Sequence, residues 1–159
     1  MLIVLEGCDG SGKSTLACSL SRLLDAEIIH CSSTTPNTKE FFEEIIEASR
    51  TRNIIADRFC YGQFVYQPIG ERPLGNIGDL NMLEVKMLDA GAKVVWVHAS
   101  DETIEQRLKH RNETVINGLD IRDVQSKFRE LFEEYSLFCN TYNFWNTDFL
   151  GGIQNESSI

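Results

Sequence analysis

Short runs of apolar residues alternate along the chain with longer stretches in which apolar side chains recur every three or four positions. The apolar runs predict five strands, at Leu2–Glu6, Glu27–Cys31, Asn53–Asp57, Lys93–His98 and Tyr142–Thr147. The stretches between them predict five helices, at Lys13–Leu24, Lys39–Ser49, Asp79–Ala90, Asp101–Arg111 and Asp123–Cys139. Because strands and helices alternate, the pattern predicts an α/β fold built on a parallel sheet.

The same pattern predicts a single domain, residues 1–150, in a chain whose 159 residues suit one hydrophobic core. Two stretches follow neither period and are predicted to be loops. Residues 67–78 are rich in proline and glycine, and residues 112–121 are polar. Residues 151–159 have weak patterning and are predicted to be a frayed tail.

Composition narrows the function classes. The net charge of −9 argues against nucleic-acid binding, which needs a basic surface. No apolar run approaches the roughly 20 residues that span a membrane. The five cysteines are scattered without a C-x-x-C pair, so we expect neither disulfides nor a zinc site, and a cytoplasmic setting.

One motif stands between the first predicted strand and the first predicted helix. It reads GCDGSGKS from Gly7 to Ser14 and fits G-x-x-x-x-G-K-[ST], the phosphate-binding P-loop. Its glycines allow backbone N–H groups to surround phosphate oxygens, and the following helix adds its positive end. We expect Lys13 to reach the β- and γ-phosphates of ATP and Ser14 to bind Mg²⁺. The predicted ATP-binding residues in this loop are Gly7, Cys8, Gly10, Ser11, Gly12, Lys13, Ser14 and Thr15.

Three blocks of sequence resemble the thymidylate kinase family. Residues 2–15, LIVLEGCDGSGKST, resemble the family's opening strand and loop. Residues 54–67, IIADRFCYGQFVYQ, are similar to its Asp-Arg-aromatic strand end followed by Ser and Ala-Tyr-Gln, with Gly62 and Val65 in place of that Ser and Ala. Residues 97–111 resemble its fourth strand and the arginine-bearing helix that follows. The resemblance implies a three-layer P-loop kinase with a five-stranded parallel sheet flanked by helices and a short lid at about residues 108–122.

The resemblance also implies roles on the acceptor side. Arg58 would grip the acceptor's phosphate, and Asp57 would arrange that phosphate or Mg²⁺. Asp9 would contact the 3′-hydroxyl of the sugar, and Tyr66 and Gln67 would contact the base or sugar. The structural alternatives are a surface ion pair for Asp57 and Arg58, a backbone cap for Asp9, core packing for Tyr66 and a turn for Gln67.

A transition-state arginine would have to come from the lid, because Gly10 and Ser11 offer none within the loop. Arg111 is the first candidate and Arg122 the second. Arg107 lies one helical turn before Arg111 and is assigned to ATP binding. The alternative for these arginines is a solvated basic face.

The segment after the second predicted strand departs from the family pattern. The family reads Arg-Glu-Pro-Gly-Gly-Thr there, whereas residues 32–38 read SSTTPNT. Phe41 or Phe42, which the helical pattern places on one face, could replace the family's base-stacking Phe, with Phe41 as the first candidate. The base and sugar preferences stay open.

The resulting interpretation is an enzyme of nucleotide biosynthesis that uses ATP and Mg²⁺ to phosphorylate a deoxynucleoside monophosphate, with dTMP as the first candidate. A kinase of nucleosides or other small alcohols, and a non-catalytic nucleotide-binding regulator, remain alternatives. The resemblance also leaves homodimerisation open.

Overall fold

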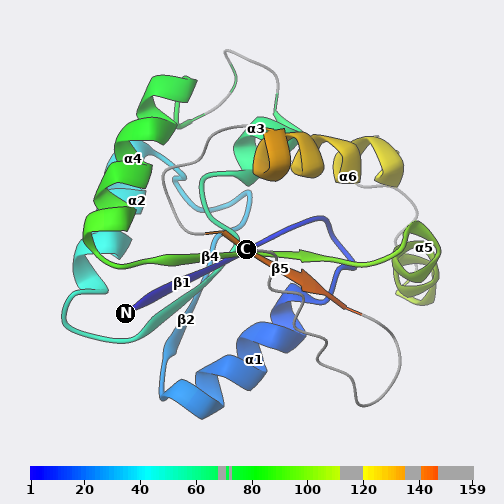
Figure 1. The fold of residues 1–159 in the computed structure, drawn as a ribbon, viewed down its shortest axis with the longest axis horizontal. Coiled ribbons are helices and arrows are strands. Elements are labelled where there is room, and N and C mark those ends of the chain that lie inside the picture. Colours follow the sequence, from blue (N-terminus) through cyan, green and yellow to red (C-terminus); the bar gives the residue numbers. More distant parts are fainter. Residues whose placement is uncertain (68–70, 72, 112–119, 135–140, 147–159) are drawn as a thin grey trace.

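The computed structural model describes residues 1–67, 71, 73–111, 120–134 and 141–146. These residues form five strands, β1 (Leu2–Glu6), β2 (Glu27–His30), β3 (Ile54–Asp57), β4 (Lys93–His98) and β5 (Thr141–Trp145). The strands build one parallel sheet in the order β2-β3-β1-β4-β5 (Figure 1). The predicted five-stranded parallel α/β fold is therefore confirmed.

Helices connect the strands and cover both faces of the sheet. They are α1 (Lys13–Leu24), α2 (Lys39–Ala48), α3 (Gly62–Tyr66), α4 (Ile77–Asp89), α5 (Asp101–His110) and α6 (Ile121–Arg129), which continues into a π-helical segment, η1 (Glu130–Glu134). Figure 1 shows α1 on one side of the sheet and α2, α3, α4 and α6 on the other. None of the described helices combines the length and apolar character needed to cross a membrane.

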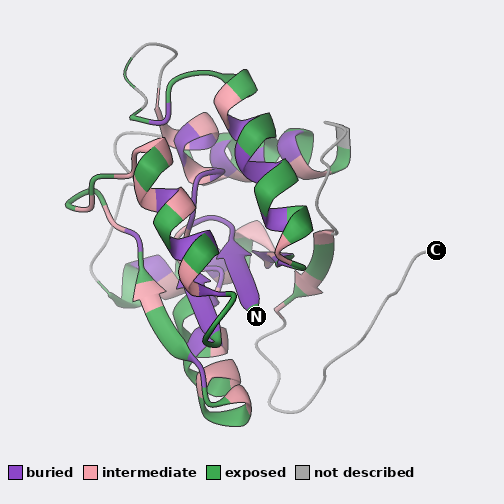
Figure 2. Ribbon diagram, turned by 90° about the vertical axis from the view of Figure 1, so that its left-hand side faces the viewer, coloured by how far each residue is buried: buried purple, intermediate pink, exposed green. Residues whose placement is uncertain are grey.

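Alternate residues of the central strands supply the two halves of the core. Ile3 and Leu5 of β1 face α1 and pack in a cluster with Ala17. Leu2 and Val4 face the opposite layer, in a larger cluster with side chains of α2, α4 and α6. Figure 2 shows the result, with buried central strands and helices that expose their outer faces. Because the strands are buried on both sides, the functional side chains collect at strand ends.

Two helices begin earlier than predicted for the same reason. In α4 the side chain of Asn76 accepts a hydrogen bond from the N–H of Gly78, and Asp79 accepts one from the N–H of Asn76. In α6 the Asp120 side chain accepts from the N–H of Arg122 at 2.8 Å. The predictions at Asp79 and Asp123 were wrong because they placed each start at an acid that already lies inside the first turn.

The sequence pattern also missed α3, which at five residues is too short to show a helical period. The helix predicted over residues 123–139 ends at Arg129 and gives way to η1, and residues 135–139 lie outside the described residues. Most of the predicted lid, residues 112–119, and the predicted tail also lie outside them.

Candidate active site

The P-loop lies between β1 and α1. Its glycines adopt backbone conformations that residues with a side chain rarely adopt. Gly7, Gly10 and Gly12 have φ angles of 139°, 82° and 101°. A Cβ atom on Gly7 would lie 2.1 Å from the carbonyl oxygen of Val97 in β4, and one on Gly12 would lie 2.0 Å from Asn146 Nδ2. The loop is thus packed against the strands beside it, and its glycines satisfy both the backbone turn and this close approach.

Lys13 is buried at the first turn of α1. Its ammonium donates hydrogen bonds of 2.7 Å to the carbonyl oxygens of both Gly7 and Cys8. Burial lowers the pKa of Lys13, and the positive charge of Arg58 lowers it further. The ammonium therefore lies against the loop backbone, where a phosphate bound by the loop would relieve its unfavourable surroundings.

Ser14 and Asp57 meet at the end of β3. The Ser14 hydroxyl donates to Asp57 Oδ2 at 2.8 Å, and His30 Nδ1 lies 3.1 Å from the same oxygen. The other carboxylate oxygen, Asp57 Oδ1, is buried and has no hydrogen-bond partner among the residues that the structure describes. A hydroxyl and a carboxylate with a spare oxygen are the hard ligands that Mg²⁺ prefers, so the pair fits the predicted metal role.

Asp9 and Arg58 form an ion pair beside the P-loop. Their side chains are 26% and 35% exposed, so both are accessible to a bound molecule. Arg58 has a φ angle of 72°, an unusual conformation for a residue with a side chain. The structure thus brings together Asp9 and Arg58, two of the residues that the sequence assigns to the acceptor.

Tyr66 follows in α3, on the same side of the molecule. Its ring packs edge-on against Phe128 of α6, with centroids 5.9 Å apart. The hydroxyl is buried, and in the described part of the chain it has no hydrogen-bond partner. Burial raises the pKa of Tyr66, and the negative charge of Asp9 raises it further. The ring contact supports the packing alternative, and the unpartnered hydroxyl near Asp9 supports a ligand contact.

For Gln67 and Phe41 the structure gives contacts within their own helices. Gln67 ends α3, and its N–H donates to the carbonyl of Gln63 at 3.1 Å. Phe41 packs edge-on against Phe42, and it is the fully buried Phe42 that contacts Phe59, at a centroid distance of 4.5 Å. The residue of this pair that packs beside Arg58's segment is therefore Phe42.

The three predicted arginines lie in different places. Arg107 Nη1 donates to the carbonyl oxygen of Gly10 at 2.8 Å, so it touches the P-loop directly. Arg111 caps the end of α5 with an exposed side chain. Arg122 is 74% exposed, and its Nε lies 3.9 Å from Asp101 Oδ2 at the start of α5. Arg107 and Arg111 are thus one turn apart on α5, whereas Arg122 faces that helix's other end.

Two residues that support the site were not predicted from the sequence. Asn146 Nδ2 donates to the carbonyl of Ser11 at 2.8 Å, and its N–H donates to the carbonyl of His98 at the same distance. His30 contacts Asp57 as described above. Each follows or ends a strand at the carboxyl edge of the sheet, where side chains commonly meet a ligand. The predicted strands had extended past both residues and hid this signal.

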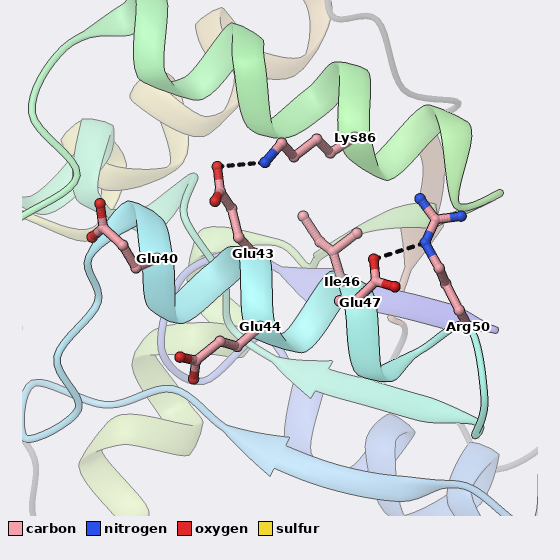
Figure 3. Close-up of a pocket in the computed structure, with 7 residues that line it drawn as sticks. All are labelled: Glu40, Glu43, Glu44, Ile46, Glu47, Arg50 and Lys86. Atoms are coloured by element: carbon pink, nitrogen blue, oxygen red, sulfur yellow. Dashed lines mark hydrogen bonds and ion pairs between the residues drawn. The ribbon is translucent and has the colours of Figure 1, made fainter.

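A hollow lies between α2 and α4, away from the P-loop, with a volume of about 510 Å³ (Figure 3). Four glutamates of α2 line it with Arg50 and Lys86: Glu40, Glu43, Glu44 and Glu47. Both basic groups already pair with glutamates, at 2.9 and 2.8 Å. The surplus of negative charge disfavours phosphates there, so the P-loop edge of the sheet stays the candidate nucleotide site.

Comparison with known proteins agrees with this fold. No protein-family model matches the chain. The chain is 35% identical over 150 residues to the SPbeta prophage-derived uncharacterized protein YorR of Bacillus subtilis, covering 92% of this chain and 88% of that protein. It is 27% identical to a probable thymidylate kinase of Methanocaldococcus jannaschii, covering 86% and 84%.

Solved structures give the same result. A crystal structure of Bacillus subtilis YorR in complex with phosphorylated GDP superimposes with a TM-score of 0.74 at 33% identity, covering 91% of this chain and 85% of YorR. Deoxyadenosine kinase from M. mycoides, with the product dCMP and a flexible dCDP, has the same fold with a TM-score of 0.57 at 17% identity, covering 90% and 88%. The chain therefore belongs to one family with YorR, as a divergent thymidylate kinase-like P-loop protein, and it shares its fold with deoxyadenosine kinase.

Proposed function

We propose that this protein transfers the γ-phosphoryl group of ATP to the phosphate of a deoxynucleoside monophosphate, with dTMP as the first acceptor to test. The observation that carries the proposal is the ion pair of Asp9 and Arg58 beside the P-loop. A guanidinium suits a phosphate because it can donate two parallel hydrogen bonds, and a carboxylate suits a sugar hydroxyl. The pair thus offers one partner for the phosphate of a nucleotide and one for its sugar.

The donor side is formed by the P-loop. Its backbone N–H groups and Lys13 would hold the β- and γ-phosphates of ATP, while Ser14 and Asp57 would hold Mg²⁺. When bound, Mg²⁺ neutralises charge on the phosphoryl oxygens. Arg107, already anchored to the Gly10 carbonyl, would lie beside the donor nucleotide.

The acceptor side requires one exchange of partners. Arg58 would leave Asp9 and grip the acceptor's phosphate, which frees Asp9 to accept a hydrogen bond from the 3′-hydroxyl of the sugar. The buried hydroxyl of Tyr66 then lies near the sugar as a further donor. Positioning of this kind accounts for most of the catalysis in phosphoryl transfer, and Arg111 is the proposed source of the additional positive charge.

A nucleoside kinase is the second candidate, since the fold is shared with a deoxyadenosine kinase. Such an enzyme needs a general base for a hydroxyl acceptor and has no acceptor phosphate for Arg58 to grip. Asp9 within the P-loop is the acid proposed to contact the sugar, and its pairing with Arg58 favours the monophosphate instead. A regulator without turnover is the third candidate, and no contact among the described residues favours it.

Homodimerisation is part of the proposal, on the evidence of α4. Met82, Val85 and Leu88 of this helix are 47%, 54% and 48% exposed and recur at helical spacing. An apolar stripe of this kind suits a second copy of the chain. Light scattering after gel filtration should give twice the monomer mass, and Val85→Glu should give the monomer mass.

The experiment is a screen of acceptors with product identification. The protein is incubated with Mg²⁺, either ATP or GTP, and each of dTMP, dUMP, dCMP, dAMP, dGMP and GMP, or the matching nucleosides. GMP and GTP are included because YorR was crystallised with phosphorylated GDP. Phosphorus NMR should show a nucleoside diphosphate formed from at least one deoxynucleoside monophosphate. Phosphorylation of nucleosides alone would replace the proposal with the second candidate.

A further inference from the structure

The side chain of Glu6 is buried beneath the candidate acceptor site. Glu6 is the last residue of β1 and is 1% exposed. Its Oε1 accepts a hydrogen bond of 2.8 Å from the N–H of Phe59 and one of 3.2 Å from the N–H of Gly62. One carboxylate oxygen therefore ties β1 to the segment that leads from β3 into α3.

A buried carboxylate is unfavourable unless its surroundings compensate for the lost water. Burial raises the pKa of Glu6, while the N–H of Phe59 and the charges of Lys13 and Arg58 act in the opposite direction. These compensating groups all belong to the P-loop region or to the segment that Glu6 holds. The carboxylate thus interacts with the candidate site and not with a separate part of the core.

The residue enclosed by these contacts is Arg58. Its own N–H donates to the carbonyl of Leu5 at 2.9 Å, so β1 binds the N–H groups of residues 58, 59 and 62. Arg58 also has the left-handed φ angle of 72°, which persists only where neighbouring contacts enforce it. The hydrogen bonds to Leu5 and Glu6 flank that strained residue on the backbone and provide the enforcement.

We infer that Glu6 is a positioning residue for Arg58: its acceptor oxygen holds the backbone turn that aims the guanidinium at the acceptor site. Glu6 itself does not touch the substrate. The inference rests on the proposed function for the identity of the acceptor, and on the hydrogen bonds alone for the positioning.

The test compares two substitutions that differ in one property. Glu6→Gln keeps an acceptor oxygen but removes the charge, and Glu6→Met removes both at a similar size. Glu84→Met is the matched control, because Glu84 is equally buried and accepts from Tyr61 Oη at 2.9 Å on the far side of the same segment. The measurements are KM for the acceptor, KM for ATP, and the amide hydrogen exchange of Phe59 and Gly62.

Glu6→Met should raise the acceptor's KM at least tenfold with less than a threefold change in KM for ATP, and should speed exchange at Phe59 and Gly62 at least tenfold. Glu6→Gln should stay within threefold of wild type in all of these. Equal changes in both KM values, a matching loss in Glu84→Met, or a Glu6→Gln variant as impaired as Glu6→Met would overturn the inference.

Amide hydrogen exchange distinguishes a failure of this inference from a failure of the proposed function. If wild type phosphorylates no monophosphate, the proposed function fails, and faster exchange in Glu6→Met still supports the positioning role. Unchanged exchange at Phe59 and Gly62 in Glu6→Met overturns the positioning role, whatever the activity. If Glu6→Met does not fold, the exchange rates of the wild-type protein test the inference. The amides of Phe59 and Gly62 should then exchange as slowly as those of β1. Exchange at the rate of an exposed loop contradicts the inference.

Discussion

The hydroxyl of Ser14 donates a hydrogen bond to Asp57 Oδ2 at 2.8 Å, which joins the first turn of α1 to the end of β3. The two residues are 43 positions apart in the chain, and the contact brings together the two side chains that we propose as ligands of Mg²⁺. Asp57 Oδ1 is buried and has no hydrogen-bond partner among the described residues, so one oxygen of the carboxylate stays unused in this contact.

Ser14→Ala should therefore weaken the use of Mg²⁺. Losing one hydroxyl that serves a charged group costs about 1.5–3 kcal/mol, which corresponds to a roughly 10- to 100-fold lower kcat/KM. The Mg²⁺ concentration for half-maximal rate should rise as well. Ser19→Ala is the control, since Ser19 lies on the same helix and bonds only to the carbonyl of Thr15 in the described contacts. An unchanged Mg²⁺ titration in Ser14→Ala would contradict the assignment.

The arginines of α5 and α6 should differ in effect. Arg107→Met removes a contact to Gly10 and should raise KM for ATP about tenfold, by the loss of roughly one charge-assisted hydrogen bond. Arg111→Met should lower kcat with little change in either KM. Arg122→Met should stay within about threefold of wild type, because its exposed ion pair contributes little. Steady-state kinetics of the three variants tests this order, and a larger loss of kcat in Arg122→Met than in Arg111→Met would reverse it.

Thiol labelling should distinguish the cysteines sharply. Cys18 is exposed, whereas Cys8 in the P-loop is buried and has its pKa raised to about 11 by that burial. Burial also raises the pKa of Cys31 to about 12. Since the thiolate is the reactive form, iodoacetamide at pH 8 should modify Cys18 at least tenfold faster than Cys8 or Cys31, as read by mass spectrometry. Equal labelling of Cys8 and Cys18 in the folded protein would contradict this.

Glu6 should also shape the dependence of stability on pH. Burial raises its folded-state pKa above the ordinary value, so its stabilising contribution is complete at low pH and is lost as pH rises through the raised pKa. Relative to Glu6→Gln, wild type should lose about 1.4 kcal/mol for each pH unit between the unfolded and folded pKa values. Urea unfolding of both proteins from pH 4.5 to 8 measures the difference. A difference in free energy of unfolding that does not change with pH, or that shifts in favour of wild type as pH rises, would contradict this prediction.

The sequence predicted the sheet and the P-loop well because both depend on local signals. The apolar runs of β1, β3 and β4 are buried on both faces, and the loop's glycines follow a fixed spacing. Asp57 and Arg58 were singled out because residues 54–67 resemble the thymidylate kinase family's Asp-Arg strand end.

The supporting contacts could not be predicted, because they join residues far apart in the chain. The hydrogen bond from Phe59 to Glu6 spans 53 positions and that from Asn146 to Ser11 spans 135. The helical pattern also placed Phe41 and Phe42 on one face without distinguishing them, and in the structure it is Phe42 that packs against Phe59. That choice depends on how α2 rotates against the sheet, which packing alone determines.

The central claim is that the acceptor carries a phosphate, which Arg58 binds. A substitution at Arg58 tests this claim separately from the rest of the site. Arg58→Asn is the suitable variant, because asparagine tolerates the left-handed backbone at this position. The loss of a bidentate grip on a phosphate should lower kcat/KM for the monophosphate by about 100-fold or more. Catalysis of any reaction that does not use an acceptor phosphate should change far less.

The most direct measurement is the ratio of kcat/KM for dTMP, or whichever monophosphate the screen selects, to that of its nucleoside. For wild type we predict a ratio of at least 100, and for Arg58→Asn a ratio close to one. A wild-type protein that prefers the nucleoside, or an Arg58→Asn variant that keeps the wild-type ratio, would contradict the account.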